Sequence, residues 1–117
     1  MEPIYDPQGQ VVGWLKGEHT YHLDGTHAAF VRGEDVHGHG GQHLGVFKGG
    51  FFRDHSGGAV GFVKGATGGL ILPIPSIPPI PPIPAIPPIP AIPAIPPIPA
   101  IPSLGWGSTS WHQFVRG

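Results

Sequence analysis

A glycine preceded by a basic residue returns every sixteen residues in the first half of the chain. The four pairs are Lys16-Gly17, Arg32-Gly33, Lys48-Gly49 and Lys64-Gly65. A period this strict indicates that one supersecondary unit is used four times between residues 2 and 65. The repeat constrains the fold of this segment more than any single residue does, because each position of the unit has to serve four equivalent places.

Within each unit the pattern predicts a β-hairpin. A second glycine marks its turn, at Gly9, Gly25, Gly41 and Gly57, because glycine supplies the positive φ that tight turns need. The strand after the turn carries apolar residues and has a very small residue near its middle, at Gly13, Ala29, Gly45 and Gly61. Such a position marks a bend or a close approach by another backbone or by a large side chain.

The four hairpins must share one core, because a single hairpin is not stable in water. Closure into a shallow ring or barrel of eight short strands also removes the sheet edges that invite aggregation. We therefore expect an all-β fold in which residues 2–65 form a closed ring of four hairpins, and an open meander is the alternative.

A different repeat, three residues long, follows a glycine-containing hinge at 66–72. From residue 74 to residue 101 an isoleucine occupies every third position, and a proline follows each isoleucine. Prolines this frequent exclude a helix interior or a central strand and predict a polyproline II helix over 73–102, with the ten isoleucines in one stripe. A straight segment would span roughly 90 Å, far more than the roughly 25 Å width of a domain of about 65 residues.

We expect the isoleucine stripe to be covered, because contiguous apolar patches of this size mark interaction surfaces. Two arrangements would cover it: the segment curves around the ring as a belt, or stripes of several chains pack together. A fully exposed stripe is the third and least favoured arrangement. The C-terminal residues 103–117 favour the belt. Residues 114–117 repeat residues 30–33 letter for letter, which predicts half of a fifth unit that returns to the ring as a strand or clamp, preceded by Trp106 and Trp111.

These motifs resemble the uncharacterised bacterial proteins described as 4-fold beta flower proteins. The resemblance rests on the turn at 5–9, the strand at 12–15 and their three echoes, the hinge at 65–69, the proline-rich triplets and the tryptophan-containing tail. It covers nearly the whole chain and implies a shallow symmetric barrel of petal-like hairpins, with no activity attached. A similarity of fold to Tubby-type shallow barrels suggests, by analogy alone, the binding of phosphoinositides or lipid surfaces.

The composition excludes several functional classes. A net charge of −1 gives no basic field for nucleic acid, and the absence of cysteine excludes disulfides and thiol chemistry. The N-terminus shows no signal peptide, and the frequent prolines exclude a membrane-spanning helix in the Ile-Pro segment. We expect a cytoplasmic protein, with peripheral attachment to a membrane as an alternative.

Eight histidines raise the question of a metal site. His27 and His43 occupy equivalent positions of neighbouring units, and so do His39 and His55. Neutral imidazole is a common ligand of zinc or nickel. No strong zinc signature accompanies these histidines, so exposed turn residues are the simpler interpretation.

Two further groups of residues are candidates for ligand binding. One is a ring of four cations that suits a phosphate or an anionic head group, unless local pairing with Glu18 and Glu34 neutralises it; its members are Lys16, Arg32, Lys48 and Lys64. The other is a shallow apolar bowl lined by Trp14, Phe30 and Phe62.

No catalytic constellation appears, because the serines lack a nucleophile-elbow context and the glycine-rich segments lack the residues of a phosphate loop. We expect a non-enzymatic binding or scaffold module without a cofactor, which contacts an anionic lipid, a membrane surface or a protein partner. Two alternatives stay open: self-assembly of homo-oligomers through the stripe from Ile74 to Ile101, and metal binding by the histidines.

Overall fold

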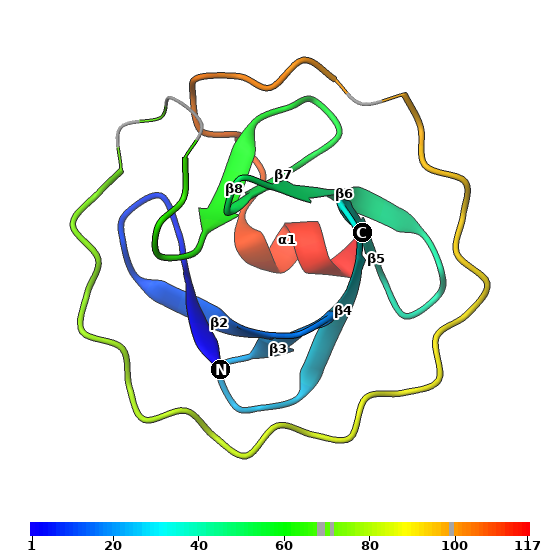
Figure 1. The fold of residues 1–117 in the computed structure, drawn as a ribbon, viewed down its shortest axis with the longest axis horizontal. Coiled ribbons are helices and arrows are strands. Elements are labelled where there is room, and N and C mark those ends of the chain that lie inside the picture. The colour runs from blue at the N-terminus through cyan, green and yellow to red at the C-terminus, as the bar shows by residue number, and fades with distance from the viewer. Residues whose placement is uncertain (68–69, 71, 99) are drawn as a thin grey trace.

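The computed structural model describes residues 1–67, 70, 72–98 and 100–117 (Figure 1). Eight antiparallel strands follow one another in chain order and close into a barrel, and a short helix lies inside the ring that they form. The elements are β1 (Glu2–Tyr5), β2 (Val11–Lys16), β3 (His19–His22), β4 (His27–Arg32), β5 (Asp35–His37), β6 (His43–Lys48), β7 (Phe51–Arg53), β8 (Ala59–Phe62) and α1 (Trp111–Arg116). The expected closed ring of four hairpins, or petals, is confirmed. Residues 68, 69 and 71 of the expected hinge, and residue 99, lie outside the described part.

The turn between the two strands of a petal, called the tip, has the same backbone hydrogen bonds in all four units. The tips span residues 6–10, 22–26, 38–42 and 54–58. The first residue of each tip donates its N–H to the carbonyl of the fifth and accepts from the glycine N–H, over 2.8–3.1 Å. Each tip glycine has a φ of 81–91°, a conformation that residues with a Cβ rarely adopt.

Three glycines of the sixteen-residue repeat lie in the turns that connect one petal to the next, and the fourth, Gly65, follows the last strand. Gly17, Gly33 and Gly49 begin these turns with φ values of 58–61°, as hairpin turns with a positive φ at the first central position require. Successive turns of an up-and-down antiparallel barrel alternate between its two ends, so the connecting turns lie at the end opposite the tips.

Every petal contains a β-bulge at the same place. The pairing register shifts by one residue near the tip of each petal, so that one residue of the second strand is extra. The extra residues are Val12, Ala28, Leu44 and Val60. A bulge bends and twists its strand, which allows short strands to close a small barrel. These four residues also pack in or against the core cluster of the barrel.

Helix α1 fills the interior of the barrel. Its residues Trp111, Phe114 and Val115 are buried in the same cluster as core residues of the strands. Ser110 caps the helix: its hydroxyl accepts the N–H of Gln113 over 3.2 Å, and the side-chain oxygen of Gln113 accepts the N–H of Ser110 over 3.0 Å.

The tail therefore returns to the ring, but the expected strand or half of a fifth unit is wrong. Within the described residues the tail pairs with the sheet at a single parallel β-bridge, between Trp106 and Ala59. Residues 111–116 lie inside the barrel, where a helix satisfies its own backbone groups. The Ser110–Gln113 capping box starts a helix, and this local signal outweighs the identity of residues 114–117 with 30–33.

The very small residues in the middle of the second strands make room for α1. A Cβ added at Gly45 would lie 2.6 Å from Cε1 of Phe114, and one added at Gly61 would lie 3.2 Å from the Trp111 ring. At Gly45 the added Cβ would also clash with the Arg53 carbonyl oxygen of the neighbouring strand. The expected close approach is therefore confirmed at these positions, by a backbone and by a large side chain that α1 supplies.

Residues 73–98 and 100–103, called the belt, encircle the petals (Figure 1). The described residues of the belt form neither helix nor strand. Four of its N–H groups, nine residues apart, donate to the carbonyls of the four tip glycines. These bonds, called docks, are Ser76 to Gly9 at 2.8 Å, Ala85 to Gly25 at 2.9 Å, Ala94 to Gly41 at 2.7 Å and Ser103 to Gly57 at 3.0 Å.

The nine-residue period of the docks fits the size of the ring. At the rise of a polyproline II helix, which stays a prediction for this segment, nine residues span about 28 Å. A square with sides of that length has a diagonal of about 40 Å, close to the 37 × 36 Å width of the molecule. Three triplets of the belt therefore correspond to one sixteen-residue unit of the ring.

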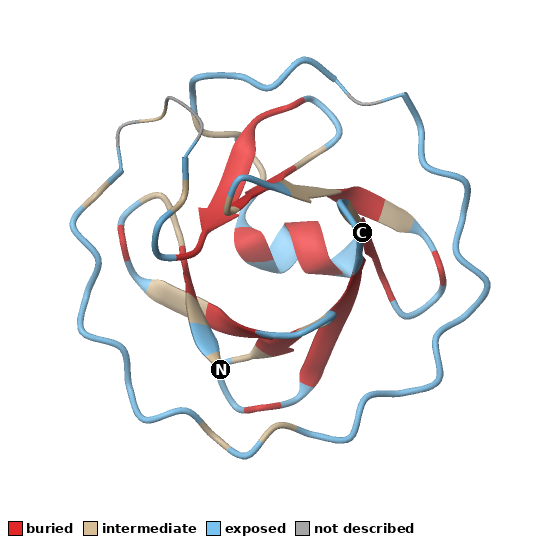
Figure 2. Cartoon of the chain, viewed as in Figure 1, coloured by how far each residue is buried: buried red, intermediate tan, exposed pale blue. Residues whose placement is uncertain are grey.

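The isoleucines of the belt are uncovered (Figure 2). All ten, from Ile74 to Ile101, are 90–96% exposed. The expectation that a belt would cover the stripe is wrong. At each dock the backbone of the belt faces the tip, because its N–H donates to the carbonyl of the tip glycine. The isoleucine side chains therefore point away from the ring.

Candidate functional site

The exposed isoleucines of the belt form the main apolar surface of the described part of the chain. Its exposed large hydrophobic side chains are these ten isoleucines and only three others, Leu23, Leu72 and Leu104. The molecule is a disc 21 Å thick, and the belt runs around its circumference (Figure 1). The isoleucines therefore face outward in nearly every direction of the plane of the disc.

The docks hold this surface at a defined distance from the ring. A Cβ added at Gly25 would lie 2.7 Å from the Ile83 carbonyl oxygen, so the tips need glycine both for their positive φ and for the approach of the belt. Two docks have a further bond. Nε2 of His37 lies 3.1 Å from the Ala94 carbonyl oxygen, and Nη1 of Arg53 donates to the Ser103 carbonyl over 2.7 Å.

The four predicted basic residues, Lys16, Arg32, Lys48 and Lys64, are all exposed. The first three end the strands that precede the connecting turns, and Lys64 follows β8. Among the described residues the one ion pair that involves them joins Nζ of Lys48 to Oε2 of Glu34 over 3.8 Å. Glu34 thus pairs with the base of the following unit and not with its near neighbour Arg32. Both partners are largely exposed, so the pair contributes less than about 1 kcal/mol.

The expected apolar bowl at Trp14, Phe30 and Phe62 is not present. These side chains are only 1–4% exposed, and they point to the outside of the barrel, since successive residues of a strand face opposite sides and the neighbouring Leu15 lies in the core cluster. The ring of Phe62 packs 5.3 Å from that of Tyr5 and 5.8 Å from that of Trp106. The interior that an open bowl would need is filled by α1.

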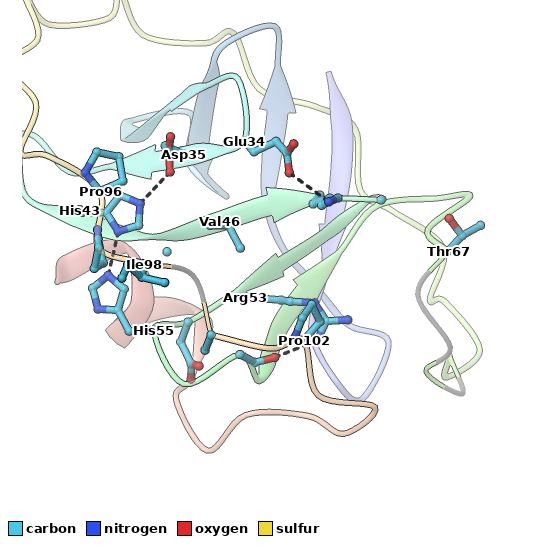
Figure 3. Close-up of a pocket in the computed structure, with 17 residues that line it drawn as sticks. Glu34, Asp35, His43, Val46, Arg53, His55, Thr67, Pro96, Ile98 and Pro102 are labelled. Atoms are coloured by element: carbon cyan, nitrogen blue, oxygen red, sulfur yellow. Dashed lines mark hydrogen bonds and ion pairs between the residues drawn. The ribbon is translucent and has the colours of Figure 1, made fainter.

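The predicted metal-binding histidines come together in a different combination from the one expected. Nδ1 of His27 lies 2.8 Å from Nε2 of His39, and one unit later Nδ1 of His43 lies 2.9 Å from Nε2 of His55. Each pair continues into a chain, because the other nitrogen of His27 lies 3.0 Å from Nδ1 of His19 and that of His43 lies 3.0 Å from Oδ1 of Asp35 (Figure 3).

These chains are linear hydrogen-bonded rows and not convergent ligand sets. The central histidine uses both ring nitrogens, and no group of three or more histidine, aspartate or glutamate side chains in the described part has the arrangement of a metal site. His27 is 8% exposed. Burial, reinforced by the nearby imidazoles of His39, His19 and His22, lowers the pKa of His27 from 6.5 to about 4, so its ring is neutral at pH 7.

A cavity of about 1200 Å³ lies between petal β5–β6, petal β7–β8 and the belt (Figure 3). We call it the chamber. Its lining includes Asp35, Val46, Lys48, Arg53 and Ile98. Of the predicted residues, the chamber brings together His43, His55, Lys48 and Ile98 of the isoleucine stripe, and it leaves out the others.

Sequence reasoning missed both the docks and the chamber. The signal for the docks is present in the triplets: the third position is proline at 79, 82, 88 and 97, but never at the docking positions 76, 85, 94 and 103. The signal for the chamber is Val46, which stands where the other units have Trp14, Phe30 and Phe62.

Residues 2–115 match the family model of the 4-fold beta flower proteins, so the chain belongs to this family and the resemblance seen in its motifs is confirmed. No curated protein and no solved structure gives a significant match. No helix in the described part of the chain is long and apolar enough to cross a membrane.

Proposed function

We propose that this beta flower protein is a non-enzymatic scaffold module that associates laterally with further copies of itself through the isoleucines of the belt. The observation that carries the proposal is the exposure of 90–96% at all ten of these residues. Single exposed isoleucines are ordinary, but a contiguous apolar surface of this extent marks an interaction site. Side chains so exposed add little to the stability of their own fold.

A second copy suits the belt because two belts have the same repeat. Isoleucines three residues apart are spaced by about 9 Å along a polyproline II helix, which leaves room for an isoleucine of a facing belt between each pair. The spacing is the same in both chains, so the two rows stay in register along the contact. The belt surrounds the disc, so one molecule can contact several neighbours in its plane.

The expected strength of a single contact is low. Two convex rims meet along a short arc, and burying an isoleucine fully contributes about 1.5–3 kcal/mol. The burial of four to six isoleucines in one contact therefore only roughly offsets the 4–15 kcal/mol that association costs in lost translational and rotational freedom. We expect weak pairs and larger planar assemblies at high concentration, because each further neighbour adds contacts.

Sedimentation velocity over a range of concentrations tests this function. The average mass of the wild type should rise with concentration, and replacement of Ile83, Ile86 and Ile89 by Gln should reduce that rise without changing the melting temperature. The matched control replaces the three bases Lys16, Arg32 and Lys64 by Gln and should leave the association unchanged. A wild type that stays monomeric at every concentration would exclude self-assembly through the belt.

Binding to an anionic lipid surface is a second candidate function. The observation in its favour is that one exposed base recurs at or just after the end of the second strand of each of the four petals. Flotation with vesicles that contain phosphatidylserine should recover the protein, and vesicles of phosphatidylcholine alone should not. Equal recovery with both vesicles, or after all four bases are changed to Gln, would contradict this function.

A further inference from the structure

Four equivalent rows of side chains cross the outer face of the barrel. Each row has one residue from the second strand of a petal at its centre and one from each neighbouring strand beside it, paired directly across the sheet. The rows are Pro3-Trp14-Tyr21, His19-Phe30-His37, Asp35-Val46-Arg53 and Phe51-Phe62-Tyr5.

The third row departs from the other three. An aromatic ring occupies the centre of the first, second and fourth rows and is almost fully buried there. In the third row the centre is Val46, which is half-buried, and its neighbours are the oppositely charged Asp35 and Arg53. The chamber opens at this row and is lined by all three residues. It therefore includes the space that an aromatic side chain takes up in the equivalent places.

Arg53 supplies a buried cation at the wall of the chamber. Its side chain is 5% exposed, and its guanidinium carbon lies 5.4 Å from the centre of the Phe51 ring. Nη1 donates to the carbonyls of Gly57 and Ser103 over 2.9 and 2.7 Å. Neither ion pair found among the described residues involves Arg53. A buried charge without a counter-ion is unfavourable, and this guanidinium has further N–H donors with which to bind an anion.

The carboxylates near Arg53 already have other partners. Oδ1 of Asp35 lies 3.0 Å from Nε2 of His43, and Oδ1 of Asp54 accepts the N–H groups of Ser56 and Gly58 over 3.0 and 3.1 Å. Glu34 lies beside Lys48. The missing counter-ion of Arg53 is therefore expected from outside the chain.

We propose that the chamber binds a small molecule that carries an aromatic ring and a carboxylate. The ring lies over Val46, in the place that Trp14, Phe30 and Phe62 occupy in the other rows, and the carboxylate accepts hydrogen bonds from Arg53. A planar guanidinium matches the geometry of a carboxylate. Small-molecule sites are clefts with a largely apolar wall and a few placed polar groups, and the chamber, at about 1200 Å³, is lined in this way.

The charges around the chamber favour a monoanion over a dianion. Its lining has two permanent cations, Lys48 and Arg53, and three carboxylates, Glu34, Asp35 and Asp54. A phosphate monoester carries nearly two negative charges at neutral pH and would meet a net negative surrounding. A carboxylate carries one charge, which Arg53 alone neutralises.

Titration calorimetry with phenylacetate as the probe tests the site, with uncharged phenylacetamide and dianionic phenyl phosphate as comparisons. Wild-type protein should bind phenylacetate more tightly than either. Val46→Phe places in the chamber the ring that Phe30 and Phe62 supply elsewhere, and it should abolish binding while the melting temperature is kept or raised. Undiminished binding to Val46→Phe, or no binding of phenylacetate to the wild type, would overturn the proposal.

A second variant tests the role of the guanidinium. Arg53→Tyr introduces the residue found at the equivalent positions Tyr5 and Tyr21. It should weaken the binding of phenylacetate by about 10-fold to 100-fold, the usual effect of removing a hydrogen bond to a charged group. The binding of phenylacetamide should not change. Where this variant does not fold, Arg53→Lys serves instead, because it keeps the charge and loses the planar geometry. Equal loss of both probes, or stronger binding of phenyl phosphate, would overturn the assignment of a carboxylate.

Discussion

Proline at position 94 should release the third dock of the belt, whereas proline at position 91 should not. The N–H of Ala94 donates to the Gly41 carbonyl over 2.7 Å, and proline has no N–H. Both alanines are the third residue of a triplet and follow a proline, so an extended belt tolerates proline equally well at either position. Ala91 corresponds to Pro73 and Pro82 in the nine-residue repeat, so the tips already accommodate proline there.

The expected difference in the free energy of unfolding is about 2–4 kcal/mol. Ala94→Pro loses one hydrogen bond, about 1 kcal/mol, and leaves the carbonyl of the buried Gly41 without its partner, about 1–3 kcal/mol. The proline ring also occupies the place where the N–H met the Gly41 carbonyl. It therefore moves the carbonyl of residue 94 away from His37. In both variants proline restricts the unfolded chain, which raises the free energy of unfolding by about 0.4–1 kcal/mol. Ala91→Pro loses no hydrogen bond, so it should be neutral or slightly stabilising.

Two measurements check this expectation. Denaturation by guanidinium, followed by circular dichroism, compares the free energies of unfolding of the two variants. Amide hydrogen exchange in the wild type should show slow exchange at the docking residues Ser76, Ala85, Ala94 and Ser103. The isoleucine N–H groups of the belt form no backbone hydrogen bonds within the described residues and should exchange fast.

Equal stability of Ala94→Pro and Ala91→Pro would refute the conclusion that the docks hold the belt. Uniform exchange along the belt would contradict it independently, because a belt held only at its two ends has no reason to protect one amide in nine. Either result would mean that the belt is positioned by its connections to the ring and to α1.

Three further predictions concern the ring and its interior. The pKa of His27 is lowered to about 4, so the unfolded chain binds a proton at this residue near pH 6.5 and the folded chain does not. The free energy of unfolding should therefore fall by up to about 3 kcal/mol between pH 6.5 and 4. Denaturation at each pH should show a smaller fall in His27→Val, and an equal fall would contradict the assignment to His27. Trp111→Ala should cost about 3–5 kcal/mol in urea unfolding, because this side chain is only 2% exposed, and a loss below 1 kcal/mol would mean that α1 does not support the barrel. Gly45→Ala should destabilise by about 1–3 kcal/mol and Gly61→Ala by less in thermal melts. The Cβ added at position 45 would clash with the Arg53 carbonyl oxygen of the neighbouring strand and would lie 2.6 Å from Phe114, whereas the nearest neighbour of the one added at position 61 lies at 3.2 Å. The reverse order would contradict the close packing at these two positions.

Local patterns in the sequence predicted much of the ring. The sixteen-residue period gave the number of petals, and the glycines of the tips gave the position of each turn, because a positive φ is a property of single residues. The small residues such as Gly45 also predicted a close approach without revealing its partner. That partner, Phe114, is 69 residues away along the chain, and no local pattern encodes such a distance.

The candidate sites were harder to predict. The stripe of isoleucines was recognised, but its exposure was not, because whether a side chain faces the ring depends on which backbone groups of the belt meet the tip carbonyls. The histidines were recognised as equivalent pairs, yet the structure joins His27 to His39 and His43 to His55. Residues at equivalent positions of the repeat are separated by a whole petal and do not meet. The histidine contacts form between residues at different positions of neighbouring petals.

The sequence by itself determined that four hairpins share one core, since each copy of the unit has an apolar face that it cannot bury alone. It also contained the two periods, sixteen residues in the ring and three in the belt. Only the tertiary structure decided how these periods fit together, because the match of nine belt residues to one petal depends on the distance between tips in the closed barrel. The same holds for the chamber at Val46, which exists because the third row lacks the ring that fills the others.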